Sequence, residues 1–208
     1  MGSVQHKIGS IRLIAPAITF SIAFVAASAL LGRLSAQDQK APGMSLPSRR
    51  MADGKRWTTD NLNARADPSY CYGDAEVNCS RYGRLYTWES ARQACESLGD
   101  GWRLPTNEEW RQLAEDYGGL LEESQERGKS TFKALIMSGS SGFNAVLGGG
   151  RDLDGQYARL NAHGFYWTAS ESGPTTAWLY NFGKGMRALN RHKDAEKQRA
   201  FSVRCVSD

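Results

Sequence analysis

The stretch Tyr86–Trp110, which reads YTWESARQACESLGDGWRLPTNEEW, decides the fold. Its first part predicts a helix, because apolar residues recur at steps of three and four and so share one face. These residues are Trp88, Ala91, Cys95 and Leu98. The link Gly101–Pro105 is too short for anything but an extended connection. The stretch therefore indicates two short helices joined by a tight link, with a cysteine inside the first.

The second helix is predicted to begin after Thr106, because Glu109 follows three residues later. In such a capping box the threonine hydroxyl accepts from a backbone N–H of the first turn, and the glutamate accepts from the threonine's own N–H. The apolar stripe of this helix consists of Trp110, Leu113, Ala114 and Tyr117. Gly118 and Gly119 can then end the helix in a left-handed turn.

The later part of the chain is predicted to form short strands, because aromatic and β-branched residues alternate with Gly, Ser, Asn and Asp. The predicted strands are Phe143–Leu147, Phe165–Ala169, Ala177–Phe182 and Phe201–Val206. In the last of them, apolar Phe201, Val203 and Cys205 occupy every second position, as in a half-buried strand. Helices followed by small antiparallel strands predict an α+β fold.

Five further segments flank the two-helix stretch: GKRWTTDNLN (54–63), SYCYGDAEVNCSRYGRLY (69–86), GFNAVLGGG (142–150), GFYWTASE (164–171) and FSVRCVSD (201–208). In this order they resemble the Fibrobacter succinogenes major paralogous domain family, bacterial envelope and secreted domains related to C-type lectin-like folds. The resemblance covers residues 51–208. It implies a disulfide-bonded C-type lectin-like domain with two short helices packed on small antiparallel sheets. The family has no general biochemical activity that could be carried over.

The N-terminal end has the layout of an export signal. His6, Lys7 and Arg12 precede the uncharged run Leu13–Gly32, and small residues lie around a cleavage position after Ala36. The uncharged run is also about as long as a membrane-spanning helix. Residues 1–36 are therefore predicted to be a signal peptide or an uncleaved signal anchor, without a cysteine for lipid attachment.

The next segment, residues 37–50, is polar, lacks apolar periodicity and contains two prolines. It is predicted to be a flexible linker that leads into the domain of residues 51–208. Export places this domain in the cell envelope, in the periplasm or at the cell surface, or in the medium as a secreted protein.

All four cysteines lie in the predicted domain, and an even number in an exported chain favours two disulfides. Three connectivities are open. Cys71 and Cys79 bound a short, turn-rich loop, so their pairing is easy and leaves Cys95 for Cys205. The lectin-like resemblance implies the same long bridge, from the first helix to the terminal strand. A metal site or a catalytic thiol is disfavoured, because the chain has no CxxC pair.

The sequence offers no catalytic signature. It contains no GxSxG, no HExxH and no glycine fingerprint that opens a helix. His163 lies in a turn before a predicted strand, where a histidine is more often structural than catalytic. Gly148–Gly150 is interpreted as a close backbone approach, because no helix start follows it. The protein is therefore predicted not to be an enzyme and to have no catalytic residue, cofactor or metal.

The segment Arg151–Gln156, RDLDGQ, carries two carboxylates spaced as at the start of a calcium loop. A helical-hand calcium site would also need a bidentate glutamate downstream, which is lacking here. A tight Asp–Gly turn is the favoured interpretation, with calcium kept as an alternative. The sugar-binding triplets of calcium-dependent lectins do not occur, so their binding residues cannot be transferred.

The segment Gly183–Ala200 holds most of the excess positive charge. Its side chains carry a net charge of +4, equal to the formal net charge of the whole chain. The basic residues are Lys184, Arg187, Arg191, Lys193, Lys197 and Arg199. The segment falls between two strands that are expected to pair, so it is either a solvated hairpin or an electrostatic footprint for an anionic partner.

The leading hypothesis is a non-catalytic, exported recognition or structural module of the bacterial cell envelope. Its predicted ligand surface comprises Arg151, Asp152, Asp154, Trp178, Lys184, Arg187 and Arg191. For Trp178 and the nearby Tyr180, core packing is the favoured interpretation, because one of two neighbouring residues in a strand must face inward. The expected partner is an anionic glycan or a cell-surface protein. Export argues against nucleic acid, and a membrane is expected only through the N-terminal segment, if that segment is uncleaved.

Two alternatives belong to other classes of protein. GWRLPTNEEW (101–110) also resembles a segment of formylglycine-generating enzymes, oxidases that bind a metal through closely spaced cysteines late in the chain. Here Cys205 is the single cysteine of the last hundred residues. The other alternative is a purely structural envelope protein whose basic hairpin contacts a partner protein. Free thiols would favour the oxidase, and a ligand screen would separate recognition from structure.

Overall fold

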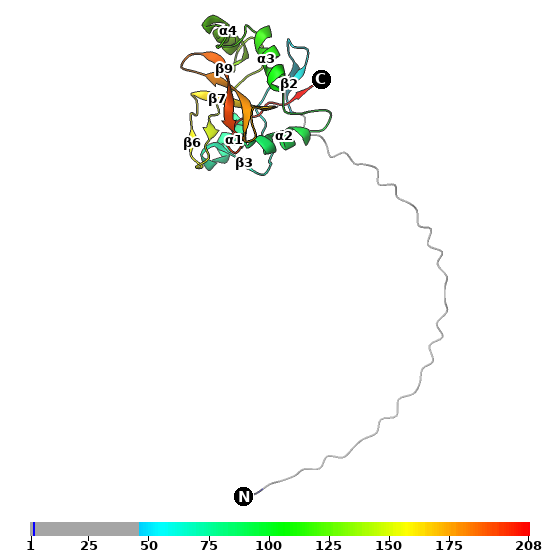
Figure 1. The fold of residues 1–208 in the computed structure, drawn as a ribbon. Coiled ribbons are helices and arrows are strands. Elements are labelled where there is room, and N and C mark those ends of the chain that lie inside the picture. The colour runs from blue at the N-terminus through cyan, green and yellow to red at the C-terminus, as the bar shows by residue number, and fades with distance from the viewer. Residues whose placement is uncertain (1, 3–45) are drawn as a thin grey trace, which may run out of the picture. The chain divides into compact units, whose positions relative to one another are not determined.

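The computed structural model describes Gly2 and residues 46–208. The predicted export segment, apart from Gly2, and most of the predicted linker lie outside the described residues. The described part has four α-helices and ten strands in four small antiparallel sheets, an α+β fold (Figure 1). Along these residues, no helix combines the length and the apolar character needed to cross a membrane.

The two predicted helices are present as α2 (Trp88–Glu96) and α3 (Asn107–Asp116). The capping box is complete, because Thr106 accepts from the backbone N–H of Glu109 and the Glu109 carboxylate accepts from the backbone N–H of Thr106. The buried stripe of α3 includes Trp110, Leu113 and Ala114, as predicted. This part of the sequence prediction is confirmed.

Two more helices correct the prediction of a two-helix domain. The region bounded by Cys71 and Cys79 contains a 3-10 turn, η1 (Tyr72–Asp74), and the start of α1 (Glu76–Tyr82), where a loop was expected. The other helix is α4 (Gln125–Leu135), which buries few apolar side chains. It depends on tertiary contact, because a Cβ at Gly128 would lie 2.7 Å from the Cα of Leu121.

The strands form four small sheets. A three-stranded sheet joins the two ends of the domain in the order β1-β2-β10, with β1 (Ser48–Arg50), β2 (Arg56–Thr58) and β10 (Val206–Ser207). Two-stranded sheets pair β3 (Ser69–Tyr70) with β4 (Leu85–Tyr86), and β5 (Gly150–Arg151) with β6 (Tyr157–Ala158). The largest sheet has the order β7-β8-β9, with β7 (His163–Glu171), β8 (Thr176–Gly183) and β9 (Ala188–Glu196).

Three strand predictions need correction. Residues 143–147 form no strand and make a single bridge, between Ile136 and Ala145. The basic segment 183–200 was expected to connect two paired strands, but it contains a strand of its own, β9. Strand β8 therefore pairs with β9 and not with the terminal segment 201–206. The terminal segment is not half-buried, because every residue from 200 to 207 is buried. It passes through the core, so both of its faces are covered.

Both disulfides implied by the sequence are present, Cys71–Cys79 and Cys95–Cys205. The long bridge ties α2 to the chain's end inside one apolar cluster, which also contains Trp167. A second cluster surrounds Trp110, whose ring stacks on Tyr180 at 5.1 Å between centroids. This second cluster includes residues of β7, β8 and β9. In Figure 1, α3 and α4 lie beside one end of the sheet that these strands form.

Arg204 lies at the centre of the terminal segment and has no solvent exposure. Its guanidinium donates to the Asn61 side-chain oxygen at 2.8 Å. It also donates to the backbone carbonyls of Thr58, Phe143 and Asn144, at 2.7 to 2.8 Å. These bonds fix the irregular segment that contains Asn144 against the loop after β2.

Candidate ligand-binding groove

Two adjoining cavities of about 500 Å³ and about 760 Å³ form a groove on the surface of the domain. Both cavities are lined by Arg81, Tyr82, Met137 and Val146, so they are continuous along α1 and the segment after α4. We call this feature the cationic groove. Its volumes lie in the range of about 300–1,000 Å³ that is typical of ligand sites.

The larger cavity combines an apolar floor with positive charge. The floor consists of Phe132, Ile136, Ala145 and Leu147. Three cations line the same cavity: Arg81 of α1, and Lys184 and Arg187 of the turn between β8 and β9. A ligand with an anionic group and an apolar part could therefore place the anionic group at the cations and the apolar part on the floor.

The smaller cavity is mainly polar. Its hydrophilic side chains are Asp60, Asn61, Asn63, Ser80, Ser138 and Asn144. The amide of Asn61 is already used, because it donates to the Tyr82 carbonyl and accepts from Arg204. Amide and hydroxyl groups orient a polar ligand without adding charge, whereas the Asp60 carboxylate adds one negative charge at this end of the groove.

The three cations of the groove have no acidic partner. Within residues 46–208, Arg81, Lys184 and Arg187 make neither an ion pair nor a side-chain hydrogen bond, and all three are exposed. The Arg81 guanidinium instead lies over the Tyr82 ring, 5.1 Å from its centroid. Their charge is therefore free to attract an anion.

Backbone strain gathers at the groove. Seven non-glycine residues of the described chain have positive φ, and four of them line the two cavities. These four are Ser138, Asn144, Asn161 and Arg187, with φ between 50° and 67°. Asparagine tolerates this conformation, so the left-handed backbone costs free energy mainly at Ser138 and Arg187, and such strain is common at ligand sites. The concentration here supports a functional role for the groove.

The α1 wall of the groove is held from several sides. The Cys71–Cys79 disulfide ties α1 to the segment that precedes it. Gly83, at the end of α1, packs so closely that a Cβ would lie 2.5 Å from the Cβ of Asn61. Across the groove, the Tyr82 hydroxyl donates to the Asn161 side-chain oxygen at 2.8 Å. These contacts place Arg81 next to the apolar floor.

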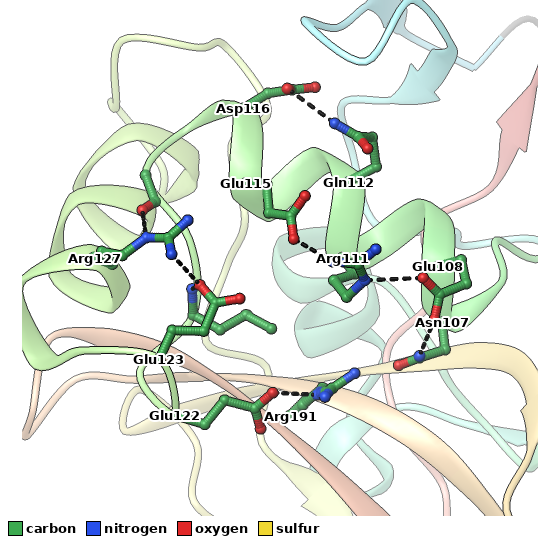
Figure 2. Close-up of polar contacts among 12 residues, drawn as sticks. Asn107, Glu108, Arg111, Gln112, Glu115, Asp116, Glu122, Glu123, Arg127 and Arg191 are labelled. Atoms are coloured by element: carbon green, nitrogen blue, oxygen red, sulfur yellow. Dashed lines mark hydrogen bonds and ion pairs between the residues drawn. The ribbon is translucent and has the colours of Figure 1, made fainter.

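The structure brings together two of the predicted ligand residues, Lys184 and Arg187, and places Arg191 in a different environment. Arg191 lies within β9, opposite Tyr180. Its Nε donates to the Glu122 carboxylate at 2.6 Å, as Figure 2 shows. Its guanidinium also lies 5.0 Å from the centroid of the half-buried Trp178 ring. Arg191 is therefore neutralised in a surface network with the acidic residues around α3.

The remaining charge of the basic segment is largely paired. The Lys197 ammonium lies 3.0 Å from the Glu171 carboxylate, and the Arg199 guanidinium lies 3.1 Å from that of Asp152. The excess positive charge of residues 183–200 is thus split between two surroundings in the folded domain. Lys184 and Arg187 line the groove, whereas Arg191 in β9 and Lys197 and Arg199 just after it meet acidic partners.

The predicted Asp–Gly turn is present in the hairpin between β5 and β6, where Gly155 has φ of +85°. Asp154 accepts from the backbone N–H of Gln156, and Asp152 pairs with Arg199. Arg151 stacks over Tyr70, 4.2 Å from the ring centroid. These three predicted ligand residues lie on this hairpin and do not line the cationic groove.

Potential metal ligands gather at one place among the described residues. One ligand atom each from Cys71, Glu76 and Cys79 lies within 4.8 Å of the others. Both sulfurs belong to the disulfide, so neither can act as the thiolate that a zinc site requires. This cluster therefore does not form a metal centre in the disulfide-bonded protein.

Sequence reasoning missed Arg81 and the apolar floor. Arg81 lies two residues after the loop predicted between Cys71 and Cys79 and was given no role, and about a hundred residues separate it from Lys184.

Of the floor residues, Phe132 lies in α4 and Ile136 follows it directly, and this helix was not predicted. Ala145 and Leu147 belong to the segment predicted as a strand, not as part of a ligand site. No sequence signal connects these segments, because the tertiary fold alone brings them to one surface.

Comparison with known proteins adds one match. Residues 45–207 match the family model described as the Fibrobacter succinogenes major domain. No curated protein and no solved structure matches the chain. Because the match spans more than half of the chain and includes α2, α3 and both disulfides, the protein belongs to the Fibrobacter succinogenes major domain family.

Proposed function

We propose that this protein is a non-catalytic, exported recognition module of the bacterial cell envelope that holds an anionic ligand in its cationic groove. The observation that carries this proposal is the set of three exposed cations around one apolar floor, none of which forms an ion pair within the part of the chain that the structure describes. Lys133, Arg159 and Lys193 are also exposed and make no ion pair within residues 46–208, so it is the gathering of the three groove cations around one apolar floor that supports an external partner. An acidic glycan, an anionic lipid and an acidic protein surface all carry the required charge.

A C-type lectin-like fold is part of the proposal. Three features support it: two successive helices, small antiparallel sheets, and the long disulfide from α2 to the chain's end. Two disulfides also support export, because such bonds persist in oxidising compartments outside the cytoplasm.

The oxidase alternative is less well supported. It requires reduced cysteines late in the chain, but Cys205 is bonded to Cys95 and the described residues contain no free cysteine. A purely structural envelope protein stays the main competitor. It would need the basic turn for stability or for contact with another protein, and it would bind no ligand in the groove.

The test removes the charge of the groove and keeps its backbone. In the full chain we would combine Arg81→Gln, Lys184→Gln and Arg187→Asn, since asparagine tolerates positive φ. A matched control, Arg65→Gln with Arg92→Gln and Lys193→Gln, removes three charges from residues that do not line the groove. Retention would be measured on immobilised polygalacturonate and on phosphatidylglycerol at increasing salt.

The proposal predicts retention of the parent protein on at least one of these probes. Each cation near an anionic surface contributes about 1 kcal/mol, so the groove variant should bind on the order of 100-fold more weakly. The control variant should bind nearly as well as the parent. Salt should weaken binding because exposed charges are screened over about 8–10 Å. Equal retention of the parent and the groove variant would overturn the proposal.

A further inference from the structure

The rim of the cationic groove carries exposed apolar side chains among its cations. Met186 is 56% exposed and lies between Lys184 and Arg187 in the turn from β8 to β9. Met137, which lines both cavities, is also 56% exposed. Of the large hydrophobic residues among those described, two others are exposed, Val77 and Leu153.

The position of Val77 strengthens this pattern. It lies four residues before Arg81 in α1, so the two side chains share one face of that helix. Three of the four exposed hydrophobic side chains, Val77, Met137 and Met186, therefore lie near a cation of the groove. Leu153, in the hairpin between β5 and β6, is the exception.

This combination of groups distinguishes between kinds of anionic ligand. A soluble polyanion would satisfy the three cations and leave Met137 and Met186 in water. An anionic membrane offers negative head groups at the depth of the cations and apolar acyl chains just beneath them. Methionine suits such a surface, because its unbranched, polarisable side chain adapts to an irregular apolar environment.

We infer that the cationic groove docks on an anionic phospholipid surface, with Met186 entering the acyl boundary and Lys184 and Arg187 meeting the head groups. This inference rests on the proposed function and names the ligand class for it. The turn is short and ends at the left-handed Arg187, so β8 and β9 hold its tip as a fixed projection. Long basic side chains beside an apolar tip can extend to the head groups while their stems stay in apolar surroundings.

The apolar floor offers a second contact for the same surface. Ile136 and Leu147 are partly buried and lie against the core around Trp110. Figure 1 shows α4, which ends just before Ile136, beside β9. One lipid molecule can thus place its head group at the cations and its upper acyl segment on this floor. The inference departs from the expectation that only the N-terminal segment meets a membrane.

The test compares vesicle binding of full-length variants produced in the same exporting host. Vesicles of phosphatidylcholine alone and of phosphatidylcholine with phosphatidylglycerol would be used, so that any contribution of the N-terminal segment is common to all variants. Met186→Ser and Met137→Ser remove the apolar groups, and Leu153→Ser is the control with similar exposure. Soluble polygalacturonate is the second probe, and the charge variant of the groove is included.

The inference predicts that phosphatidylglycerol increases binding of the parent protein, and that each methionine substitution weakens this binding about fivefold. That factor corresponds to partial burial of one large apolar side chain. Leu153→Ser should bind as the parent does, and neither methionine variant should change any binding to polygalacturonate.

Four results would overturn the inference, and they separate its failure from that of the proposed function. If polygalacturonate binding depends on the groove charges while phosphatidylglycerol has no effect, the membrane inference fails and the proposed function stands. If both methionine variants bind vesicles as the parent does, the same conclusion follows. If the charge variant binds both probes as well as the parent, or if the parent binds neither, the proposed function fails as well.

Discussion

Arg204 and the cations of the groove are the same kind of group in opposite surroundings. Arg204 has no solvent exposure, and its guanidinium donates four hydrogen bonds within the domain. Burial lowers its pKa, yet the acceptors around it compensate for lost water. Arg81, Lys184 and Arg187 have exposed side chains without ion pairs among the described residues. The first cation organises the fold, and the other three are left for a partner.

The two regions also differ in their covalent support. Cys205 follows Arg204 directly, and its bond to Cys95 closes a separation of 110 residues. Cys79 precedes Arg81 in α1 and lines the smaller cavity, and its bond to Cys71 closes a separation of eight residues. The long bridge therefore constrains the whole domain, whereas the short one holds a wall of the groove.

Removing each disulfide gives the largest expected effects. In the chain-entropy model, the change of Cys95 and Cys205 to alanine costs about 5 kcal/mol and that of Cys71 and Cys79 about 2.5 kcal/mol. Denaturant unfolding of both double variants measures the difference. The short-bridge variant should also bind phosphatidylglycerol more weakly, because Arg81 loses its support. Equal losses of stability would show that the two regions are not constrained differently.

Substitution of Arg204 tests the structural role of the buried cation. Arg204→Met keeps the length of the side chain and leaves three carbonyls and the Asn61 oxygen without their donor. The free energy of unfolding should fall by roughly 3–5 kcal/mol. Arg81→Met is the matched control and should change it by less than about 0.5 kcal/mol. A loss below 1 kcal/mol at Arg204, on the order of one ordinary hydrogen bond, would contradict this role.

Glu109 provides an intermediate case, a half-buried carboxylate with several donors. Burial alone would raise its pKa, but the bidentate bond from Arg103 and the Thr106 backbone N–H lower the pKa to about 2. Its contribution to stability is therefore present above its ordinary pKa of 4.5 and is lost as the pH falls toward 2.

Glu109→Gln should consequently lower the free energy of unfolding by about 3 kcal/mol near neutral pH, where the carboxylate is charged. The difference from the parent should shrink as the pH falls from 4.5 to 2. Denaturant unfolding at a series of pH values checks this. A difference that does not vary with pH would show that the carboxylate is not stabilised by Arg103.

The helix pair and the disulfides could be predicted because their signals are local or countable. The capping box at Thr106 acts within one helical turn, and four cysteines leave few pairings. Helix α4 has a local cap, since the Ser124 side chain accepts from the backbone N–H of Arg127, but its interior Gly128 and few buried apolar side chains hide the helical pattern. Gly128 packs closely against Leu121, a tertiary contact that the sequence does not show. Propensity alone does not identify a helix that tertiary packing stabilises.

Arg204 and the groove show why the remaining features could not be predicted. Three acceptors of Arg204 are backbone carbonyls, which every residue has, so the sequence shows only a polar residue in a strand-like pattern. The groove combines α1, the segment after α4 and the turn after β8. The predicted residues Lys184 and Arg187 do line it, but Arg191 could not be separated from them without knowledge of Glu122.

The most direct test measures binding and unfolding together for the variant that combines Arg81→Gln, Lys184→Gln and Arg187→Asn. Because these exposed cations form no ion pair among the described residues, the free energy of unfolding should change by less than about 0.5 kcal/mol. Binding to phosphatidylglycerol should fall on the order of 100-fold at low salt. A variant that loses stability and keeps its binding would contradict the assignment of these cations to a ligand.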